Sequence, residues 1–292
     1  SGVLMRDSYQ GFRVLLVHAH PDDETINNGA TMAMYAALGA SVTLVTCTRG
    51  EEGEVLIPEL SHLAASATDS LGQHRITELA LAMKELGVAD HRFLGEGVKL
   101  YRDSGMMGTE PNNRPDVFWQ ADLDEAADLL VRVIDEVKPH VLITYDEFGG
   151  YGHPDHIQAH RVAMRAAEKS EWDIPKIYWN VMPISVIQEG IDAMKGIDSD
   201  FWGAEKTEDL PFAKDDSFVH ALVDGNAYVN KKMNAMKAHS TQIAVDGPFF
   251  ALSNNVGLQV WGNEYYTLVK GEKSAPLNEK GYESDLFAGI SL

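Results

Sequence analysis

Two stretches of this sequence concentrate histidine and carboxylate side chains. The first is His18-Ala-His-Pro-Asp-Asp-Glu24, and the second runs from Tyr145 to His156 as Tyr-Asp-Glu-Phe-Gly-Gly-Tyr-Gly-His-Pro-Asp-His. Two imidazoles and one carboxylate are a common donor set for Zn(II) or Fe(II), and they leave a coordination position open for water. The triplet His-Pro-Asp occurs in both stretches. These residue types predict one divalent metal bound between two distant parts of the chain.

The spacing within each stretch indicates which side chains can share an ion. His20 and Asp23 lie three residues apart on a turn that contains a proline, so both can contact one cation. The second stretch adds a third ligand, which is His153, His156 or His160, and spacing alone does not choose among them. Three protein donors leave the ion able to activate a water.

Other polar side chains of the two stretches are candidates for acid and base catalysis. With Asp23 used as a ligand, the adjacent Asp22 is free to take a proton from a water whose pKa the ion lowers to ~7. Hydrolysis also needs a proton for the leaving group and a donor for the developing oxyanion. We expect Tyr151, His153 and Asp155 to supply these functions.

Simpler structural roles compete with these interpretations. An Asp-Asp-Glu run after a strand is more often a solvated helix N-terminus, but the repeated His-Pro-Asp triplet favours a site here. We predict that His18 is a hydrogen-bonded core side chain and that His160 packs beside the site without binding metal. Cys47 lies within an apolar run and is predicted to be buried rather than nucleophilic.

Apolar runs and helical periodicity alternate along the first 170 or so residues. Short apolar runs predict buried strands, and apolar residues at spacings of three and four predict amphipathic helices. The predicted strands are 13–19, 41–48, 91–94 and 140–144, and the predicted helices are 30–38, 61–86, 123–137 and one beginning at Pro154. A loop is expected at 20–28. This alternation is typical of an α/β fold, here a Rossmann-like, doubly wound and mainly parallel sheet.

Beyond about residue 177 the alternation weakens. A helix near 226–237 and a strand near 265–269 are expected among segments interrupted by proline and glycine. We interpret residues 11–185 as a metal-binding α/β domain and residues 186–292 as a smaller α+β portion that helps to shape the substrate pocket. Ligands of open parallel sheets bind beyond the carboxyl ends of the strands, and both histidine-rich stretches begin at such ends.

The composition narrows the range of partners. The 292 residues include 44 acidic and 24 basic side chains, a formal charge of −20, which disfavours nucleic acid and anionic membranes as partners. The single cysteine cannot form an intramolecular disulfide, and the N-terminal apolar run is far shorter than the ~20 residues that span a bilayer. We expect a cytoplasmic protein that acts on a small molecule, and the sequence does not predict its oligomeric state.

The two stretches resemble the motifs of the LmbE-like or PIG-L family of N-acetylglucosamine deacetylases, which are metal-dependent enzymes. The most specific matches are Ala-His-Pro-Asp-Asp-Glu at 19–24 and His-Pro-Asp-His at 153–156. The likeness extends to the segments 45–55, 101–106, 149–152 and 238–242, so it covers most of the chain.

This resemblance implies a role for each residue of the candidate site. The implied metal ligands are His20, Asp23 and His156, with Zn(II) as the ion and Fe(II) as the alternative. The implied catalytic residues are Asp22 as base, His153 as acid or electrostatic partner, Asp155 as the group that orients His153, and Tyr151 as the group that polarises the acetamide carbonyl. The implied sugar contacts are Arg75, Asp103 and Asn27, although the family more often has serine at the position of Asn27.

The resemblance also implies a substrate, an N-acetylated amino-sugar glycoside. The chain is most similar to the branch of the family that deacetylates N-acetylglucosaminyl-inositol in mycothiol biosynthesis. The alternatives within the family are another N-acetylglucosamine deacetylase and the amidase of mycothiol S-conjugates, which usually has proline where Gly152 stands here. Two alternatives belong to other classes: a metal-dependent phosphoesterase that uses two ions, and a sugar-binding module with a structural metal.

Overall fold

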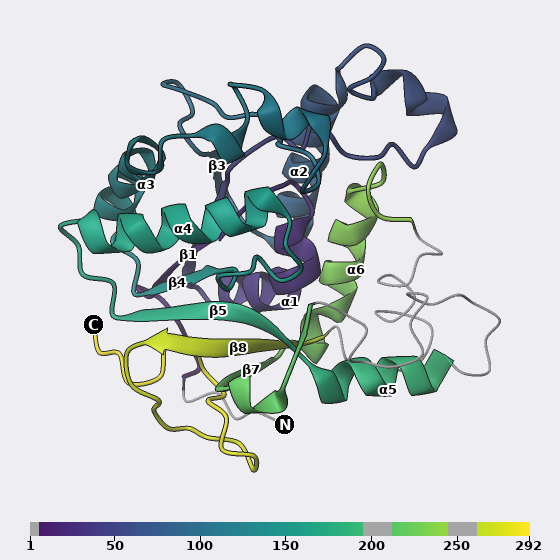
Figure 1. The fold of residues 1–292 in the computed structure, drawn as a ribbon. Helices are drawn as coiled ribbons and strands as arrows, with labels where there is room; N and C mark the ends of the chain where they lie inside the picture. Colours follow the sequence, from purple (N-terminus) through teal and green to yellow (C-terminus); the bar gives the residue numbers. More distant parts are fainter. Residues whose placement is uncertain (1–5, 195–211, 245–261) are drawn as a thin grey trace.

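A single mixed sheet forms the centre of the molecule (Figure 1). The computed structural model describes residues 6–194, 212–244 and 262–292, and the structural statements below refer to these. In this part of the chain the sheet has eight strands, with the order β3-β2-β1-β4-β5-β8-β7, and β6 pairs with β5. The strands are β1 (Arg13–His18), β2 (Ser41–Thr46), β3 (Asp90–Phe93), β4 (Val141–Thr144), β5 (Lys176–Pro183), β6 (Ala213–Lys214), β7 (Ala221–Asp224) and β8 (Asn263–Lys270).

The strands β3, β2, β1, β4 and β5 run parallel to one another, and β1 lies at their centre. Successive side chains of β1 point to opposite faces of the sheet, so Val14 and Leu16 enter one core while Leu15 and Val17 enter the other. Each such side chain contributes about 1.5–3 kcal/mol on full burial. Burial on both faces explains why the predicted strands appear as continuous apolar runs rather than alternating ones.

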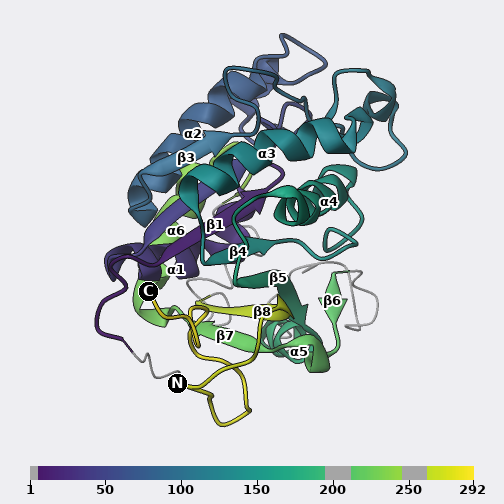
Figure 2. The same cartoon turned by 90° about the vertical axis from the view of Figure 1, so that its left-hand side faces the viewer.

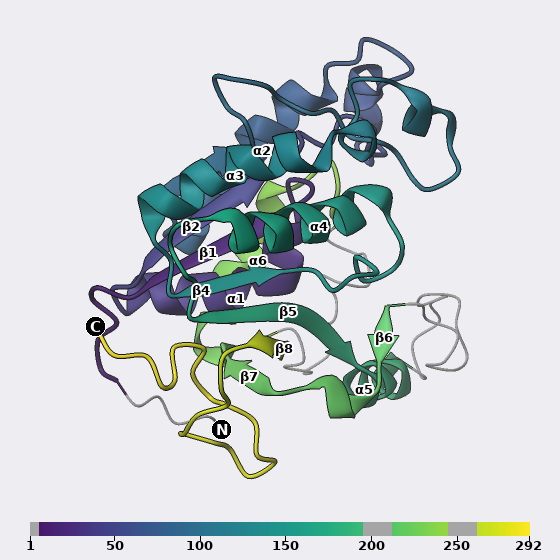
Figure 3. The same cartoon turned by 60° about the vertical axis from the view of Figure 1, so that its left-hand side comes forward.

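Helices cover both faces of the sheet. Residues of α1, α2 and α6 pack into one core, and residues of α3 and α4 pack into the other. Figure 3 shows α3 and α4 in front of the strands, with α1 and α6 behind them. The helix bounds are α1 (Asp23–Ala37), α2 (Leu71–Leu86), α3 (Leu123–Val137), α4 (Pro154–Lys169), α5 (Ile184–Met194) and α6 (Val229–Ala238). Short 3₁₀ segments are η1 (Pro58–Leu63), η2 (Glu110–Asn113), η3 (Phe118–Gln120), η6 (Asp216–Phe218) and η7 (Asn226–Tyr228).

The predicted fold class is confirmed, since the sheet is mainly parallel and has helices on both sides. The predicted helix 123–137 coincides with α3, whose first turn is capped by the Asp122 carboxylate accepting from the Glu125 amide at 2.9 Å. The helix predicted to begin at Pro154 also begins there, as α4.

Two predicted boundaries are wrong. Residues 20–28 were expected to form a loop, but α1 begins at Asp23, and its first turns contain Asn27 and Gly29. These residues are poor helix formers, but Gly29 lies against α6, where an added Cβ would come within 3.0 Å of Lys232 Cγ. Tertiary packing therefore outweighs local propensity at this helix.

The helix predicted over 61–86 begins only at Leu71. The preceding residues form η1 and a turn, in which the Thr68 hydroxyl donates to the His62 carbonyl at 2.6 Å and Asp69 has φ +54°. Serine, threonine and aspartate side chains offer the backbone such local partners in place of helical ones. On α2 itself Leu79, Met83 and Leu86 are buried, whereas Ala80 is exposed.

The C-terminal strands extend the same sheet. β8 pairs antiparallel with β5, and β7 pairs antiparallel with β8, as Figure 2 shows below β5. The helix and strand expected near 226–237 and 265–269 correspond to α6 and β8. The division into portions 11–185 and 186–292 stays a prediction. No helix in the described ranges is both long enough and apolar enough to cross a membrane.

The order of the strands fixes where the site can lie. The chain leaves β1 toward β2 on one side, whereas β4 lies on its other side. This arrangement is the switch point of a doubly wound sheet, where ligands bind beyond the carboxyl ends of the strands. Both histidine-rich stretches follow strands at this point.

Candidate metal centre and active site

The segments that follow β1 and β4 bring the predicted metal ligands together. Each of His20, Asp23 and His156 offers one ligand atom, and these atoms lie within 4.8 Å of one another. Asp23 Oδ2 is 3.2 Å from His156 Nε2 and 3.5 Å from His20 Nδ1. His160 is not part of this group. Its Nδ1 lies 2.8 Å from the carbonyl oxygen of Tyr145. Of the three histidines that spacing left open, His156 is the one that shares this group with His20 and Asp23.

Both imidazoles have their second nitrogen fixed by a protein acceptor. His20 Nε2 is 2.9 Å from Asp155 Oδ2, and His156 Nδ1 is 3.0 Å from the Gly149 carbonyl oxygen. Such outer partners set the ring orientation and leave the other nitrogen's lone pair for a metal. His156 Nε2 is buried and has no hydrogen-bond partner within the described residues. A buried, unsatisfied acceptor beside a carboxylate fits a bound cation.

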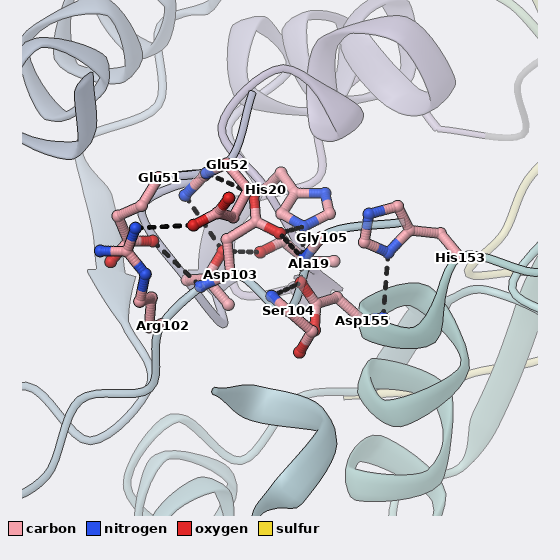
Figure 4. Close-up of polar contacts among 12 residues, drawn as sticks. Ala19, His20, Glu51, Glu52, Arg102, Asp103, Ser104, Gly105, His153 and Asp155 are labelled. Carbon is pink, nitrogen blue, oxygen red and sulfur yellow. Dashed lines mark hydrogen bonds and ion pairs between the residues drawn. The ribbon is translucent and has the colours of Figure 1, made fainter. Parts of the chain in front are cut away.

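A second group of possible donors, whose members Figure 4 labels, also includes His20. It consists of His20, Asp103, His153 and Asp155. Its carboxylates already accept several hydrogen bonds: Asp155 from the Ser104 amide at 2.9 Å and from the Ser104 hydroxyl, and Asp103 from the Gly105 amide at 2.9 Å. These hydrogen bonds occupy acceptor positions of the second group, whereas His156 Nε2 of the first group is unsatisfied within the described residues. Both groups are candidate metal sites.

Tyr145 is a site residue that the sequence did not reveal. Its hydroxyl donates to Asp23 Oδ2 at 2.7 Å and accepts from the Ala19 amide at 3.0 Å. Its ring stacks on that of His156, with centroids 4.3 Å apart and planes at 13°. Its position directly after β4, at the end of a strand where ligands bind, could have indicated a site residue. A tyrosine at this position is also compatible with simple packing in the core.

The sequence also did not reveal Ser104 and Gly149, which hold the side chains around the site. Ser104 bonds to Asp155, 51 positions away, and Gly149 acts through its backbone carbonyl.

The predicted role of His18 is confirmed. It is fully buried, with Nε2 2.7 Å from Asn28 Oδ1 and Nδ1 3.1 Å from the Tyr145 hydroxyl. Cys47 is buried as predicted, and burial raises the pKa of its thiol, which disfavours the nucleophilic thiolate.

Asp22 precedes α1 in a strained conformation. Its φ is +137°, and its side chain makes no capping hydrogen bond to the helix. A non-glycine residue in such a region costs about 1–3 kcal/mol. Burial, together with the neighbouring Asp23 carboxylate, raises the pKa of Asp22 to about 8, and Arg75, 3.5 Å away, opposes that rise. Asp22 lines a cavity beside the two imidazoles, so the strained conformation places a proton acceptor where a substrate can reach it.

Burial by itself raises the pKa of Asp23, but the His156 and His20 imidazoles outweigh it and hold that pKa well below its usual range. His153 shows the opposite case. Burial, followed by the charges of His20 and His156, lowers the pKa of His153 to about 2. The site therefore favours an ionised Asp23 beside a neutral His153.

Tyr151, His153 and Asp155 lie around the same group of imidazoles. Tyr151 is 45% exposed at the cavity, and its ring meets that of His156 edge to face at 5.1 Å. His153 is the N-cap of α4, and its Nδ1 accepts from the Asp155 amide at 3.0 Å. Asp155 thus contacts His153 through its backbone amide, whereas its carboxylate holds His20. Since Nδ1 is an acceptor, a neutral His153 carries its proton on Nε2.

The three predicted sugar contacts lie at different depths. Asn27 lines the cavity and donates from Nδ2 to the Asp23 carbonyl at 2.8 Å. Arg75 is 3% exposed and donates to the Gly50 carbonyl at 2.8 Å and to the Pro21 carbonyl. Asp103 is 4% exposed, with Oδ1 3.4 Å from His20 Nε2.

A cavity of about 640 Å³ opens beside the metal ligands. Its volume lies within the range of small-molecule sites. Polar residues line the end next to the ligands, and apolar ones such as Ile26, Leu56 and Met182 line more of the wall. A compact polar molecule that presents one reacting group to Asp22 and His156 fits this arrangement.

Comparisons with known proteins show which proteins the chain is similar to. The chain is 58% identical to 1D-myo-inositol 2-acetamido-2-deoxy-alpha-D-glucopyranoside deacetylase 1 of Catenulispora acidiphila, over 96% of this chain and 90% of that protein. It is also 58% identical to the deacetylase of the same name from Geodermatophilus obscurus, over 95% of this chain and 98% of that protein. The solved N,N'-diacetylchitobiose deacetylase from Pyrococcus horikoshii has a similar fold, with a TM-score of 0.58 at 18% identity, covering 89% and 84% of the two chains.

A family model described as GlcNAc-PI de-N-acetylase matches residues 15–167, which is more than half of the chain and includes every proposed metal ligand. The chain belongs to the PIG-L family.

Proposed function

We propose that this protein removes the acetyl group from the glucosamine of 1D-myo-inositol 2-acetamido-2-deoxy-α-D-glucopyranoside. The products are acetate and the free amine. The 58% identity to deacetylases that carry this name, over nearly the whole chain, supports the proposal. The observation that carries it is the meeting of His20, Asp23 and His156 at a cavity that Asp22 also lines.

The donor set fits a single divalent cation, which we propose to be Zn(II), with Fe(II) as the alternative. Two imidazoles and a carboxylate are typical ligands of both ions, and the unsatisfied Nε2 of His156 supports such binding. When bound, the ion would polarise the acetamide carbonyl and lower the pKa of a water.

We assign the base function to Asp22. Its carboxylate faces the cavity, makes no capping bond, and has a raised pKa. A base of this kind takes the proton of the attacking water and holds it close to the reacting carbonyl. Its neighbour Asp23 is engaged with both imidazoles and with Tyr145, so it is not free for the same task.

We assign hydrogen-bond donation to His153 and Tyr151. A neutral His153 with its proton on Nε2 can donate to the leaving nitrogen or to the developing oxyanion. The exposed Tyr151 hydroxyl can donate to the acetamide oxygen from the cavity side. We assign a sugar contact to Asn27, which lines the cavity. Sugar contacts by Arg75 and Asp103 stay predictions.

A panel of substrates tests this function. We expect acetate release from the N-acetylglucosaminyl-inositol to exceed release from free N-acetylglucosamine, because the relatives at 58% identity are named for the inositol glycoside. Faster cleavage of a mycothiol S-conjugate would instead assign the chain to the amidase. At Gly152, φ is +91°, which proline cannot adopt because its φ is fixed near −65°. This loop conformation is therefore incompatible with the proline that the amidase pattern carries.

A further inference from the structure

A buried ion pair lies directly behind the proposed base. His239 follows α6, and its Nε2 is 2.8 Å from Glu24 Oε2 on the first turn of α1. Both side chains are fully buried, and neither lines the cavity. The other ring nitrogen of His239 has no hydrogen-bond partner within the described part of the chain. Glu24 is therefore the hydrogen-bond partner of the His239 ring among the described residues.

Glu24 in turn holds the backbone of Asp22. Its Oε1 accepts from the Asp22 amide at 3.0 Å, while Oε2 accepts from His239 and from the Thr25 hydroxyl. An aspartate before a helix ordinarily caps the helix with its own carboxylate. Here Asp22 makes no such bond and has φ +137°. The bond from its amide to Glu24 holds that conformation and leaves the Asp22 carboxylate free for the cavity.

The segment that carries His239 is itself fixed from a second helix. Glu78 of α2 accepts from the Thr241 amide at 2.8 Å and from the Thr241 hydroxyl at 2.7 Å. The Leu56 amide donates to the Thr241 carbonyl at 3.0 Å. His239 is thus held from α2 as well as by the packing of α6, so it can act as a fixed point for Glu24.

We propose that His239 is a positioning residue for catalysis, acting through Glu24 to hold Asp22 in the strained conformation that aims its carboxylate at the substrate. This inference rests on the proposed function, in which Asp22 is the base. It gives a function to the histidine of the segment 238–242, which lies more than 200 residues along the chain from the base that it supports. The His239 imidazole bonds to Glu24, which is neither a proposed metal ligand nor a cavity-lining residue, so we expect its loss to affect the rate and not the metal.

The experiment compares His239→Ala and His239→Gln, which keeps an N–H donor, with Tyr35→Phe as the control. Tyr35→Phe removes a buried hydrogen bond to Asp285 near the other end of α1, and it touches neither Glu24 nor the segment of His239. We expect His239→Ala to lower kcat roughly 10²-fold, as a small misplacement of a reacting group does, with unchanged KM and metal content. His239→Gln should recover most of the rate, and Tyr35→Phe should retain it. Should His239→Ala not fold, His239→Leu carries the same expectation.

A double-substitution cycle separates this inference from the proposed function. In an Asp22→Asn background, His239→Ala should lower kcat no further, because both changes act on one group. Additive losses, or a wild-type kcat in His239→Ala, would overturn the positioning role. An equal loss in Tyr35→Phe would also overturn it, by showing a purely structural effect. Full activity of Asp22→Asn would instead overturn the base assignment on which the inference depends.

Discussion

The two segments that form the site differ in how they are held. The segment after β1 places His20, Asp22 and Asp23 within four residues and continues at once into α1. The segment after β4 takes eight residues to reach His153 at the start of α4, and three of its glycines have positive φ. The first is buried and fixed by side chains from distant elements, whereas the second carries the exposed Tyr151.

We infer from this difference that the β1 segment and the β4 segment have different functions. Metal and base need fixed geometry, which the short β1 segment supplies through Asp155, Tyr145 and Arg75. The longer β4 segment joins one rigid end, His156 in α4, to a more accessible part that includes the exposed Tyr151 at the cavity. Substitutions in the β1 segment should lower metal affinity and kcat. Substitutions in the β4 segment should change KM, except where they touch His156.

The largest effect is expected from His156→Ala, which removes a metal ligand. We expect metal binding to weaken by more than the roughly 10 to 100-fold typical of losing an outer partner, with activity lost in parallel. His153→Ala is the matched comparison, because the two rings stack with centroids 5.1 Å apart. Elemental analysis after dialysis should show metal retained in His153→Ala. Metal lost from His153→Ala and kept in His156→Ala would place the ion in the second donor group.

Asp22→Asn should have the next largest effect. We expect kcat to fall about 10²–10⁴-fold, the range for loss of a general base, because an amide cannot accept the proton. Metal content and KM should stay close to those of the wild type, since Asp23 still binds the ion. Acetate release and elemental analysis on the same preparation measure both. Loss of metal in this variant would show that Asp22 is a ligand.

The fold could be predicted from the sequence where local pattern and tertiary environment agree. The helix α3 has a continuous apolar stripe and a capping aspartate, and its predicted bounds match the structure. The start of α1 could not be predicted, because Gly29 is a poor helix former that is accommodated by close packing against Lys232 of α6. Local propensity carries no information about partners 200 residues away.

The candidate site shows the same limit. The spacing of His20 and Asp23 was enough to pair them, since both lie on one turn. It could not choose the third ligand, because that depends on which histidine of the β4 segment faces Asp23 after α4 packs on the sheet. Tyr145 and Ser104 act through contacts with residues 122 and 51 positions away, which no local pattern reveals.

Tyr145→Phe should weaken metal binding on the rigid side of the site. The hydroxyl bonds to Asp23 Oδ2 and to the Ala19 amide disappear, while the stacking on His156 remains. We expect the metal affinity to fall about 10 to 100-fold, measured by competition with a chelating dye. Tyr178→Phe is the control, because its buried hydroxyl bonds to Glu283 away from the site. Equal losses in both variants would argue against a specific role for Tyr145.

Two glycines of the β4 segment give the smallest and most selective test. Gly149 and Gly152 have φ +63° and +91°, so alanine at either position should cost about 1–2 kcal/mol of stability and lower Tm by a few degrees. Only at Gly149 would the added Cβ collide with a ligand, since it would lie 2.5 Å from His156 Cβ, whereas at Gly152 it meets nothing within 4 Å. Gly149→Ala should therefore also weaken metal binding, and Gly152→Ala should not. If calorimetry and metal titration instead show the two variants losing metal affinity equally, the β4 segment supports the ion as one rigid unit, and the contrast with the β1 segment fails.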